Sequence, residues 1–207
     1  MSRHTRTPPK QQRAIETRSA LLLGAAAVFS RMPYADARLK DISLESGISD
    51  GALYFHFGSK REIAAAVVEA QQERMVAVLT AVLAQSGNGL RKLLQANREL
   101  AVVISTDVIV QGGIRLGNQP STELSDVTRE PYFEWIRLAR TLTQQGIEDG
   151  SVAPDVDPSN AAEFLNSLFI GAQVLSGLDD GWVSMPRRID ALEPFIVRVL
   201  ASSAGEE

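Results

Sequence analysis

Apolar side chains recur at intervals of three and four residues along most of this chain, and that spacing predicts helices. The first such segment covers residues 12–32 and ends at Pro33, which cannot continue a helix. A short helix is expected over residues 39–46. A second short helix is expected to begin after Ser49, whose hydroxyl can accept from backbone N–H groups ahead of it. Ser59 is expected to cap a long helix in the same way.

The rest of the chain continues this pattern. Residues 102–110 are rich in β-branched side chains, yet no partner strand with alternating polarity occurs, so we expect helix there as well. Gly112, Gly113 and residues 117–121 are expected to break the helix or form a loop. Further helices are predicted over residues 132–149, 160–178 and 189–201. The chain is therefore predicted to be all-α.

Composition limits the chemistry more than the fold. The chain has 207 residues, of which 44% are hydrophobic and 22% charged, as in an ordinary globular protein of one domain or two small ones. Cysteine is absent, and His4 and His56 are the only histidines. This excludes disulfides, thiolate metal sites and a cysteine nucleophile. We expect neither a metal nor a cofactor.

Charge is distributed unevenly along the chain. Residues 1–61 carry ten Lys or Arg against five Asp or Glu, although the net charge of the whole chain is −4. A basic first third suggests contact with a polyanion, although chance would also explain it. The basic start and the apolar run at 20–29 resemble a signal peptide, but Arg31 follows at once. No apolar run reaches the about eighteen residues of a membrane span, so we expect a cytoplasmic protein.

Residues 39–55 carry the motif that points to a function. Two short predicted helices flank a turn at Gly47, and Ile42, Ile48 and Leu53 are spaced to share a small core. This pattern is typical of a helix-turn-helix, whose second helix enters the DNA major groove, although an ordinary helical hairpin has the same pattern.

The surrounding residues resemble the TetR family of transcriptional repressors. The resemblance covers residues 12–65 and rests on three stretches, Thr17-Arg18 through Phe29 to Tyr34, Ile42 to Ile48, and Gly51-Ala52-Leu53-Tyr54-Phe55-His56-Phe57 with Lys60. It implies a homodimer with an N-terminal three-helix DNA-binding domain, here residues 1–61, and a C-terminal helical domain for ligand binding and dimerisation, here residues 62–207.

The resemblance also implies DNA contacts at matching positions. Tyr54, His56 and Lys60 would contact phosphates, and Lys40 would add sequence-independent attraction. Four residues would face the floor of the groove: Ser49, Asp50, Gly51 and Ala52. Asp50 stands where related proteins often have a basic residue. It would either accept from a cytosine amino group or face water.

A narrower resemblance concerns the C-terminal part. Residues 107–116 and 131–135 resemble the γ-butyrolactone receptors of actinomycetes, in which a tryptophan lines the pocket for a lactone, butenolide or furan signal; Trp135 matches it. Weaker candidates for the effector site follow from helix faces. They are Tyr132, Gln72, Ile109, Phe169 and Gln173.

Dimerisation is expected to use the last two helices. The small or apolar residues expected at that interface are Gly171, Ala172, Ser176, Ile196, Val199 and Leu200. A two-fold dimer would read a pseudo-palindromic operator, that is, double-stranded DNA with two half-sites.

Three alternatives stay open. In the first, the chain is a TetR-type regulator of an efflux or antibiotic gene and senses an unrelated hydrophobic ligand. In the second, it is a ligand-binding helical protein that has lost DNA binding, as Asp50 would suggest. In the third, it is a hydrolase, because residues 47–51 spell G-x-S-x-G, although that motif needs a strand before the serine and a distant histidine.

Overall fold

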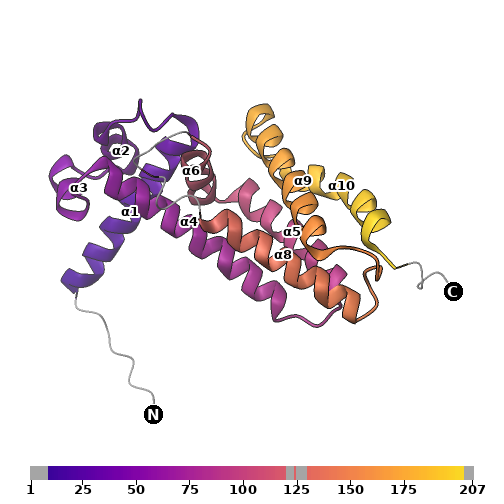
Figure 1. The fold of residues 1–207 in the computed structure, drawn as a ribbon. Coiled ribbons are helices and arrows are strands. Elements are labelled where there is room, and N and C mark those ends of the chain that lie inside the picture. The colour runs from indigo at the N-terminus through magenta and orange to yellow at the C-terminus, as the bar shows by residue number, and fades with distance from the viewer. Residues whose placement is uncertain (1–8, 120–123, 125–129, 203–207) are drawn as a thin grey trace, which may run out of the picture. The chain divides into compact units, whose positions relative to one another are not determined.

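A computed structural model of the chain describes residues 9–119, 124 and 130–202, and for residues 9, 10 and 130–133 it describes only the backbone. These residues form helices and no strand, as predicted. Figure 1 shows the helices in chain order: α1 (Pro9–Arg31), α2 (Leu39–Ser46), α3 (Asp50–His56), α4 (Lys60–Leu83), α5 (Gly89–Thr106), α6 (Val108–Gly117), α8 (Glu130–Glu148), α9 (Pro158–Asp179) and α10 (Met185–Leu200).

The helices form two compact units. The N-terminal unit comprises residues 1–71 and 108–128, and the C-terminal unit comprises residues 72–107 and 129–207. The boundary predicted after residue 61 stays a prediction for the division of function. The compact units divide after residue 71 because the first turns of α4 pack with the N-terminal helices. Helix α6 also packs with them.

The helices of the N-terminal unit pack around one apolar core. Leu21 and Phe29 of α1, Ile42 of α2 and Leu53 of α3 have no exposed surface and belong to one cluster, with Ile48 packed against it. The predicted shared core of the helix-turn-helix is confirmed. Burying side chains of this size contributes about 1.5–3 kcal/mol each, so this core fixes how α2 and α3 are held.

Gly47 makes the turn between α2 and α3 possible. Its φ of 68° lies in the left-handed region, where a side chain would be strained. The turn is tightened by the Ser43 hydroxyl, which donates to the Ile48 carbonyl. The turn residue predicted from the sequence therefore ends α2.

The prediction of a break at Gly112 and Gly113 is wrong, because both lie inside α6. A Cβ at Gly112 would lie 2.7 Å from the Ala26 carbonyl oxygen, and one at Gly113 would lie 2.5 Å from the Gln71 Cβ. The two glycines therefore let α6 pack closely against α1 and α4. The β-branched run before them is helical, as predicted, with Asp107 between α5 and α6.

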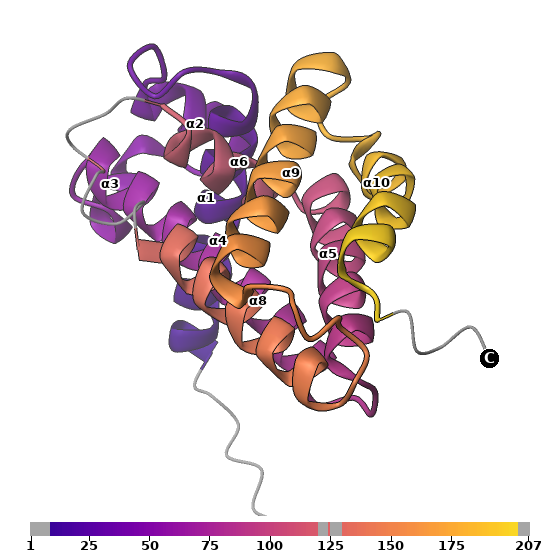
Figure 2. The ribbon, with the colours of Figure 1, turned by 45° about the vertical axis from the view of Figure 1, so that its right-hand side comes forward.

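The C-terminal unit is a bundle in which α5, α8, α9 and α10 share a second core. Leu93, Leu142, Leu165 and Leu200 are each at most 1% exposed there. Figure 2 shows α9 and α10 running side by side in opposite directions. α9 begins as predicted, because the Asp157 carboxylate accepts from Asn160 N–H at 2.8 Å and Pro158 occupies the first turn.

α9 is apolar on two faces. Leu165 and Phe169 are buried in the bundle, whereas Val174, Leu175 and Leu178 are 42%, 56% and 81% exposed. By length and composition alone, α9 is long and apolar enough to cross a membrane, with a mean hydropathy of 1.2 over eighteen residues. Its buried core face and its exposed apolar face together account for this high mean hydropathy.

Candidate functional site

Ser49 caps the N-terminus of α3. Its hydroxyl accepts from the Ala52 N–H at 3.4 Å, so the predicted cap is confirmed. Leu53 anchors α3 in the core, which leaves Ser49, Asp50 and Gly51 exposed and Ala52 half-buried. The four residues expected to face the groove therefore lie together at one end of α3.

This local structure differs from a nucleophile elbow. Ser49 stands between two helices, α2 and α3, rather than between a strand and a helix, and its oxygen is used by the cap. The G-x-S-x-G letters at residues 47–51 thus describe the turn of the helix-turn-helix.

The end of α3 presents three aromatic rings. Tyr54 is 59% exposed, and His56 is half-buried with its ring edge-on to Phe55, at 5.3 Å between ring centroids. Phe55 is 82% exposed. Sequence reasoning did not single out Phe55, although its position between the core residues Leu53 and Phe57 indicates an outward side chain.

Lys60 has a structural role that the sequence did not predict. Its ammonium donates to the carbonyls of Tyr34 at 2.8 Å, Ala37 at 3.0 Å and Ala35 at 3.5 Å, and lies 4.4 Å from the centre of the Tyr34 ring. An ammonium has three N–H donors, so Lys60 holds the turn between α1 and α2. Its predicted phosphate contact would compete with these bonds.

Charged groups around the motif are partly paired. Arg31 donates to Glu45, which lowers the pKa of the Glu45 carboxyl and raises that of Arg31. The Arg18 guanidinium lies 5.0 Å from the centre of the Phe57 ring, a cation–π distance. Lys40 and Asp50 are exposed. Asp50 lies in the first turn of α3, where an acid is favoured by the helix dipole.

Two of the predicted effector residues come together in the C-terminal unit. The rings of Trp135 on α8 and Phe169 on α9 lie 6.1 Å apart between centroids, tilted by 45°. Phe169 and Gln173 are each 4% exposed and lie one turn apart on the inner face of α9. The structure thus assembles an aromatic pair with a buried amide nearby.

Three buried side-chain atoms of the C-terminal unit lack a hydrogen-bond partner among the described residues. The Trp135 indole nitrogen and the Asn166 side-chain oxygen have no hydrogen-bond partner within the described ranges, and the same holds for the Trp182 indole nitrogen at the turn between α9 and α10. Leaving such a group unpaired costs about 1–3 kcal/mol. Asn166 was missed by sequence reasoning, although its spacing of three residues from Phe169 places it on the same side of α9.

Two of the remaining effector candidates lie on other helices, Ile109 on α6 and Gln72 on α4. Ile109 is 2% exposed in the core of the N-terminal unit, and Gln72 is half-buried on α4. The side chain of Tyr132 lies outside the described residues.

The expected dimer surface needs correction. Gly171 and Val199 are exposed, but Ala172, Ser176, Ile196 and Leu200 are buried within the single chain. The uncovered apolar surface of α9 and α10, here called the α9–α10 face, consists instead of Val174, Leu175, Leu178, Phe195 and Val199.

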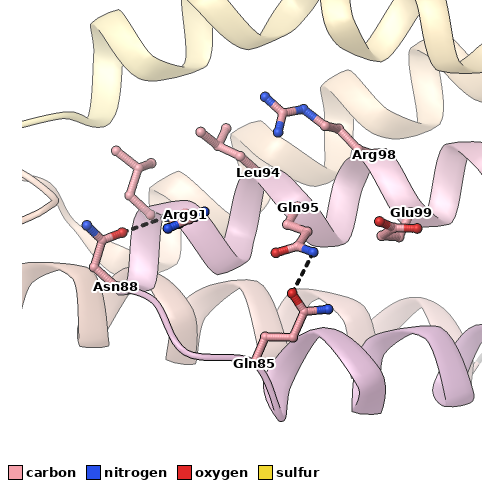
Figure 3. A pocket seen from close by; sticks show the side chains of 8 residues that line it. Gln85, Asn88, Arg91, Leu94, Gln95, Arg98 and Glu99 are labelled. Carbon is pink, nitrogen blue, oxygen red and sulfur yellow. Dashed lines mark hydrogen bonds between the residues drawn. The ribbon is translucent and has the colours of Figure 1, made fainter.

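A polar groove of about 530 Å³ lies along α5 (Figure 3). It is lined by none of the predicted site residues. Asn88 caps α5 at its end by accepting from Arg91 N–H at 2.9 Å, and Gln95 donates to Gln85 at 2.9 Å. Arg98 is paired with Glu193 of α10. This open, self-paired surface is distinct from the Trp135–Phe169 pair. No group of three or more His, Asp or Glu with metal-site geometry occurs among the residues that the structure describes.

Comparison with known proteins gives consistent matches. Residues 21–67 match the bacterial regulatory proteins of the tetR family, and residues 88–202 match the tetracyclin repressor-like C-terminal domain. The chain is 30% identical to the A-factor receptor protein of Streptomyces griseus over 83% of its own length, but the match spans only 59% of that protein.

Solved structures agree with these matches. The crystal structure of TylP, a TetR regulator from Streptomyces fradiae, is 31% identical with a TM-score of 0.70, covering 93% of this chain and 90% of that one. A γ-butyrolactone receptor (ArpA-like protein) of known structure has a TM-score of 0.78 at 24% identity, covering 93% of this chain and 92% of that one, which shows a shared fold.

Proposed function

The chain belongs to the tetR family of bacterial regulatory proteins, and from that premise we propose that it is a homodimeric transcriptional repressor released from its operator by a small, mostly apolar signal. The observation that carries the proposal is the helix-turn-helix itself. Its inner residues close a core, while Ser49, Asp50, Gly51 and Tyr54 are left exposed along α3.

In this proposal α3 enters the major groove. Its first residues, Ser49 to Ala52, face the base edges, and the small side chains of Gly51 and Ala52 permit close approach. Tyr54 and His56 contact phosphates, and Lys40 adds attraction without sequence preference. Lys60 contributes to phosphate binding only where a phosphate replaces one of its carbonyl partners.

The dimer is proposed to form through the α9–α10 face. Exposed apolar residues gathered on two neighbouring helices mark an interaction site, and a second copy buries the same face by two-fold symmetry. Two recognition helices related in this way read half-sites about 34–36 Å apart, or a multiple of that distance. The repressor would then act in the cytoplasm, where the chromosome is.

The effector is proposed to bind next to Trp135 and Phe169. Similarity to the A-factor receptor protein and to the lactone-receptor motif around Trp135 supports a γ-butyrolactone, butenolide or furan as the class of signal. Binding shifts the population between a DNA-binding and a released state. The free energy of this shift is limited by the difference between the ligand's binding free energies for the two states.

A gel shift on the promoter DNA beside the protein's own gene tests the proposal. We expect binding that resists competitor DNA, weakens with salt and is abolished by a crude lactone extract. Tyr54→Ala should remove the specific shift, whereas Val76→Ala, at an exposed site on α4, should retain it. A wild-type protein that is folded but shifts no promoter fragment at low or moderate salt would contradict DNA reading.

A further inference from the structure

The chain passes between the two compact units within α4 and again between α5 and α6. The boundaries fall after Gln71 and after Asp107, so residues 72–107 belong to the C-terminal unit and the residues on either side belong to the N-terminal unit. Helix α4 is continuous through its boundary, whereas α5 and α6 meet at an angle of 99°. A change that travels along these helices from one unit to the other has to pass these two points.

One ion pair joins the two crossing points. The Arg74 Nε donates to the Asp107 carboxylate at 2.6 Å, although the two residues are 33 positions apart in the chain. Their side chains are 37% and 27% exposed. Arg74 is the third residue after the boundary in α4, and Asp107 is the last residue before the boundary at the α5–α6 corner. The pair therefore ties together the two ends of the segment 72–107.

Asp107 also forms the corner between α5 and α6. Its backbone is extended, with φ −107° and ψ 112°, and its N–H donates to the Val103 carbonyl at 2.9 Å, which ends α5. Helix α6 begins at the next residue, Val108. A residue that ends one helix and directly precedes the next fixes where the two helices meet. Because its carboxylate is bound to Arg74 by a charge-assisted hydrogen bond, this corner is held on α4.

Helix α6 contacts α4 at a second point, one turn earlier. A Cβ at Gly113 would lie 2.5 Å from the Gln71 Cβ, so the two helices approach closely there. Gln71 and Arg74 are three residues apart in α4 and therefore lie on the same side of that helix. One side of α4 thus contacts α6 through Gln71, in the N-terminal unit, and the α5–α6 corner through Arg74, in the C-terminal unit.

We infer that Arg74 and Asp107 form a positioning pair that couples the two units. Their ion pair makes the α5–α6 corner and α4 shift together, so a change in the C-terminal unit reaches the core that the first turns of α4 share with α2 and α3. A partly exposed ion pair contributes little to overall stability, so its removal should weaken the coupling more than it destabilises either unit. The inference goes beyond the proposed function, and only its DNA-binding test rests on that function.

Urea unfolding of the full-length protein tests the coupling without ligand or DNA. The two tryptophans, Trp135 and Trp182, both lie in the C-terminal unit, so their fluorescence reports on that unit, whereas circular dichroism reports on the helices of both units. Coupled units unfold in one transition, in which the two signals coincide. We expect coincidence in the wild type, and midpoints that differ by about 0.5 M urea or more in Asp107→Asn. Separate transitions in the wild type, or coincident signals in Asp107→Asn, would overturn the inference.

Two control variants separate coupling from ordinary stabilisation. Arg74→Lys keeps a positive charge opposite Asp107 and should keep the two signals coincident. Asp179→Asn removes a comparable ion pair, to Arg188 at 2.7 Å, which joins α9 and α10 away from the crossing points. It should shift both signals equally or not at all. An equal shift of both signals in Asp107→Asn would show that its ion pair only stabilises. Arg74→Gln provides the same test where Asp107→Asn does not fold.

A parallel gel shift with the crude lactone extract separates this inference from the proposed function. Asp107→Asn should bind promoter DNA within about twofold of the wild type, but the factor by which the extract weakens binding should be about tenfold smaller. Equal release of both proteins by the extract would overturn the inference and keep the proposed function. A wild-type protein that shifts no promoter fragment would contradict the repressor, and the unfolding comparison would still decide whether the pair couples the units.

Discussion

The two compact units differ in how completely each satisfies its own side chains. In the N-terminal unit one core is closed, and no described buried side-chain atom lacks a hydrogen-bond partner. All three unpaired atoms, on Trp135, Asn166 and Trp182, lie in the C-terminal unit, together with the uncovered α9–α10 face. The difference is consistent with the proposed division of roles, in which the N-terminal unit reads DNA and the C-terminal unit binds a ligand and a second copy.

The largest expected effect tests the completeness of the N-terminal unit. Leu53→Ala leaves a cavity at a side chain with no exposed surface, and should lower the free energy of unfolding by about 2–5 kcal/mol. Urea denaturation followed by circular dichroism measures it. Leu44→Ala, at a side chain that is 72% exposed, should change stability by less than about 0.5 kcal/mol. Equal effects at both sites would contradict a closed core.

The next effect tests whether the α9–α10 face needs a second copy. Leu178→Asp places a charge on that face and should convert the dimer to a monomer in sedimentation analysis. DNA binding should then weaken by about a hundredfold or more, because two half-sites are no longer joined. Val102→Asp, on the exposed side of α5, is the matched control. A Leu178→Asp protein that remains a dimer would place the interface elsewhere.

The next prediction tests whether Lys60 stabilises the N-terminal unit through its internal hydrogen bonds. Lys60→Met removes three bonds to the turn between α1 and α2 and should lower the free energy of unfolding by about 1–3 kcal/mol. The dependence of DNA affinity on salt should keep its slope, since the lost bonds are internal. A slope that falls by about one, with stability unchanged, would show that Lys60 contacts a phosphate.

A smaller effect, opposite in sign, tests the incompleteness of the C-terminal unit. Asn166→Leu removes an unpaired buried oxygen, so the ligand-free protein should become more stable by about 1 kcal/mol. Asn97→Leu removes an amide that is hydrogen-bonded to the Leu93 carbonyl and should give no such gain. Thermal unfolding of both variants without ligand makes the comparison. Destabilisation by Asn166→Leu would mean that its oxygen is paired in solution.

The smallest effect concerns pH. Desolvation acts to raise the pKa of Asp149, but hydrogen bonds from Ser151 and from the Gly89 backbone outweigh it, so the pKa is lowered. A lowered pKa contributes stability that is present above the unfolded pKa and is lost as pH falls through the folded pKa. Unfolding measured across the acid range should show a shallower loss in Asp149→Asn. Identical profiles would remove Asp149 from the account.

Local signals allowed most of the fold to be predicted. Ser49, Ser59 and Asp157 cap the helices they precede. A short polar side chain just ahead of an apolar periodic segment commonly accepts from the first backbone N–H groups of the helix, so these caps could be predicted. The prediction at Gly112 and Gly113 was wrong because a glycine pair breaks a helix in isolation, whereas the close packing on Ala26 and Gln71 that requires these glycines is long-range.

The candidate sites could be predicted only in part. Trp135 and Phe169 were found by motif and helix spacing, but the unpaired state of Asn166 depends on what surrounds it in three dimensions. The carbonyls that occupy Lys60 come from a turn about 25 residues earlier in the chain. Periodicity also could not tell which apolar face of α9 is buried within one chain, so Ala172 and Ser176 were assigned to the wrong surface.

The most direct test of the account measures DNA affinity and ligand response in one sample. Fluorescence anisotropy of a labelled operator fragment would be followed while a γ-butyrolactone is added to wild-type protein and to Trp135→Phe. The account predicts equal DNA affinity for both proteins without ligand, release of DNA from the wild type, and a higher lactone concentration for release from the variant. Lactone binding that leaves DNA affinity unchanged, or a variant that has lost DNA affinity without ligand, would contradict it.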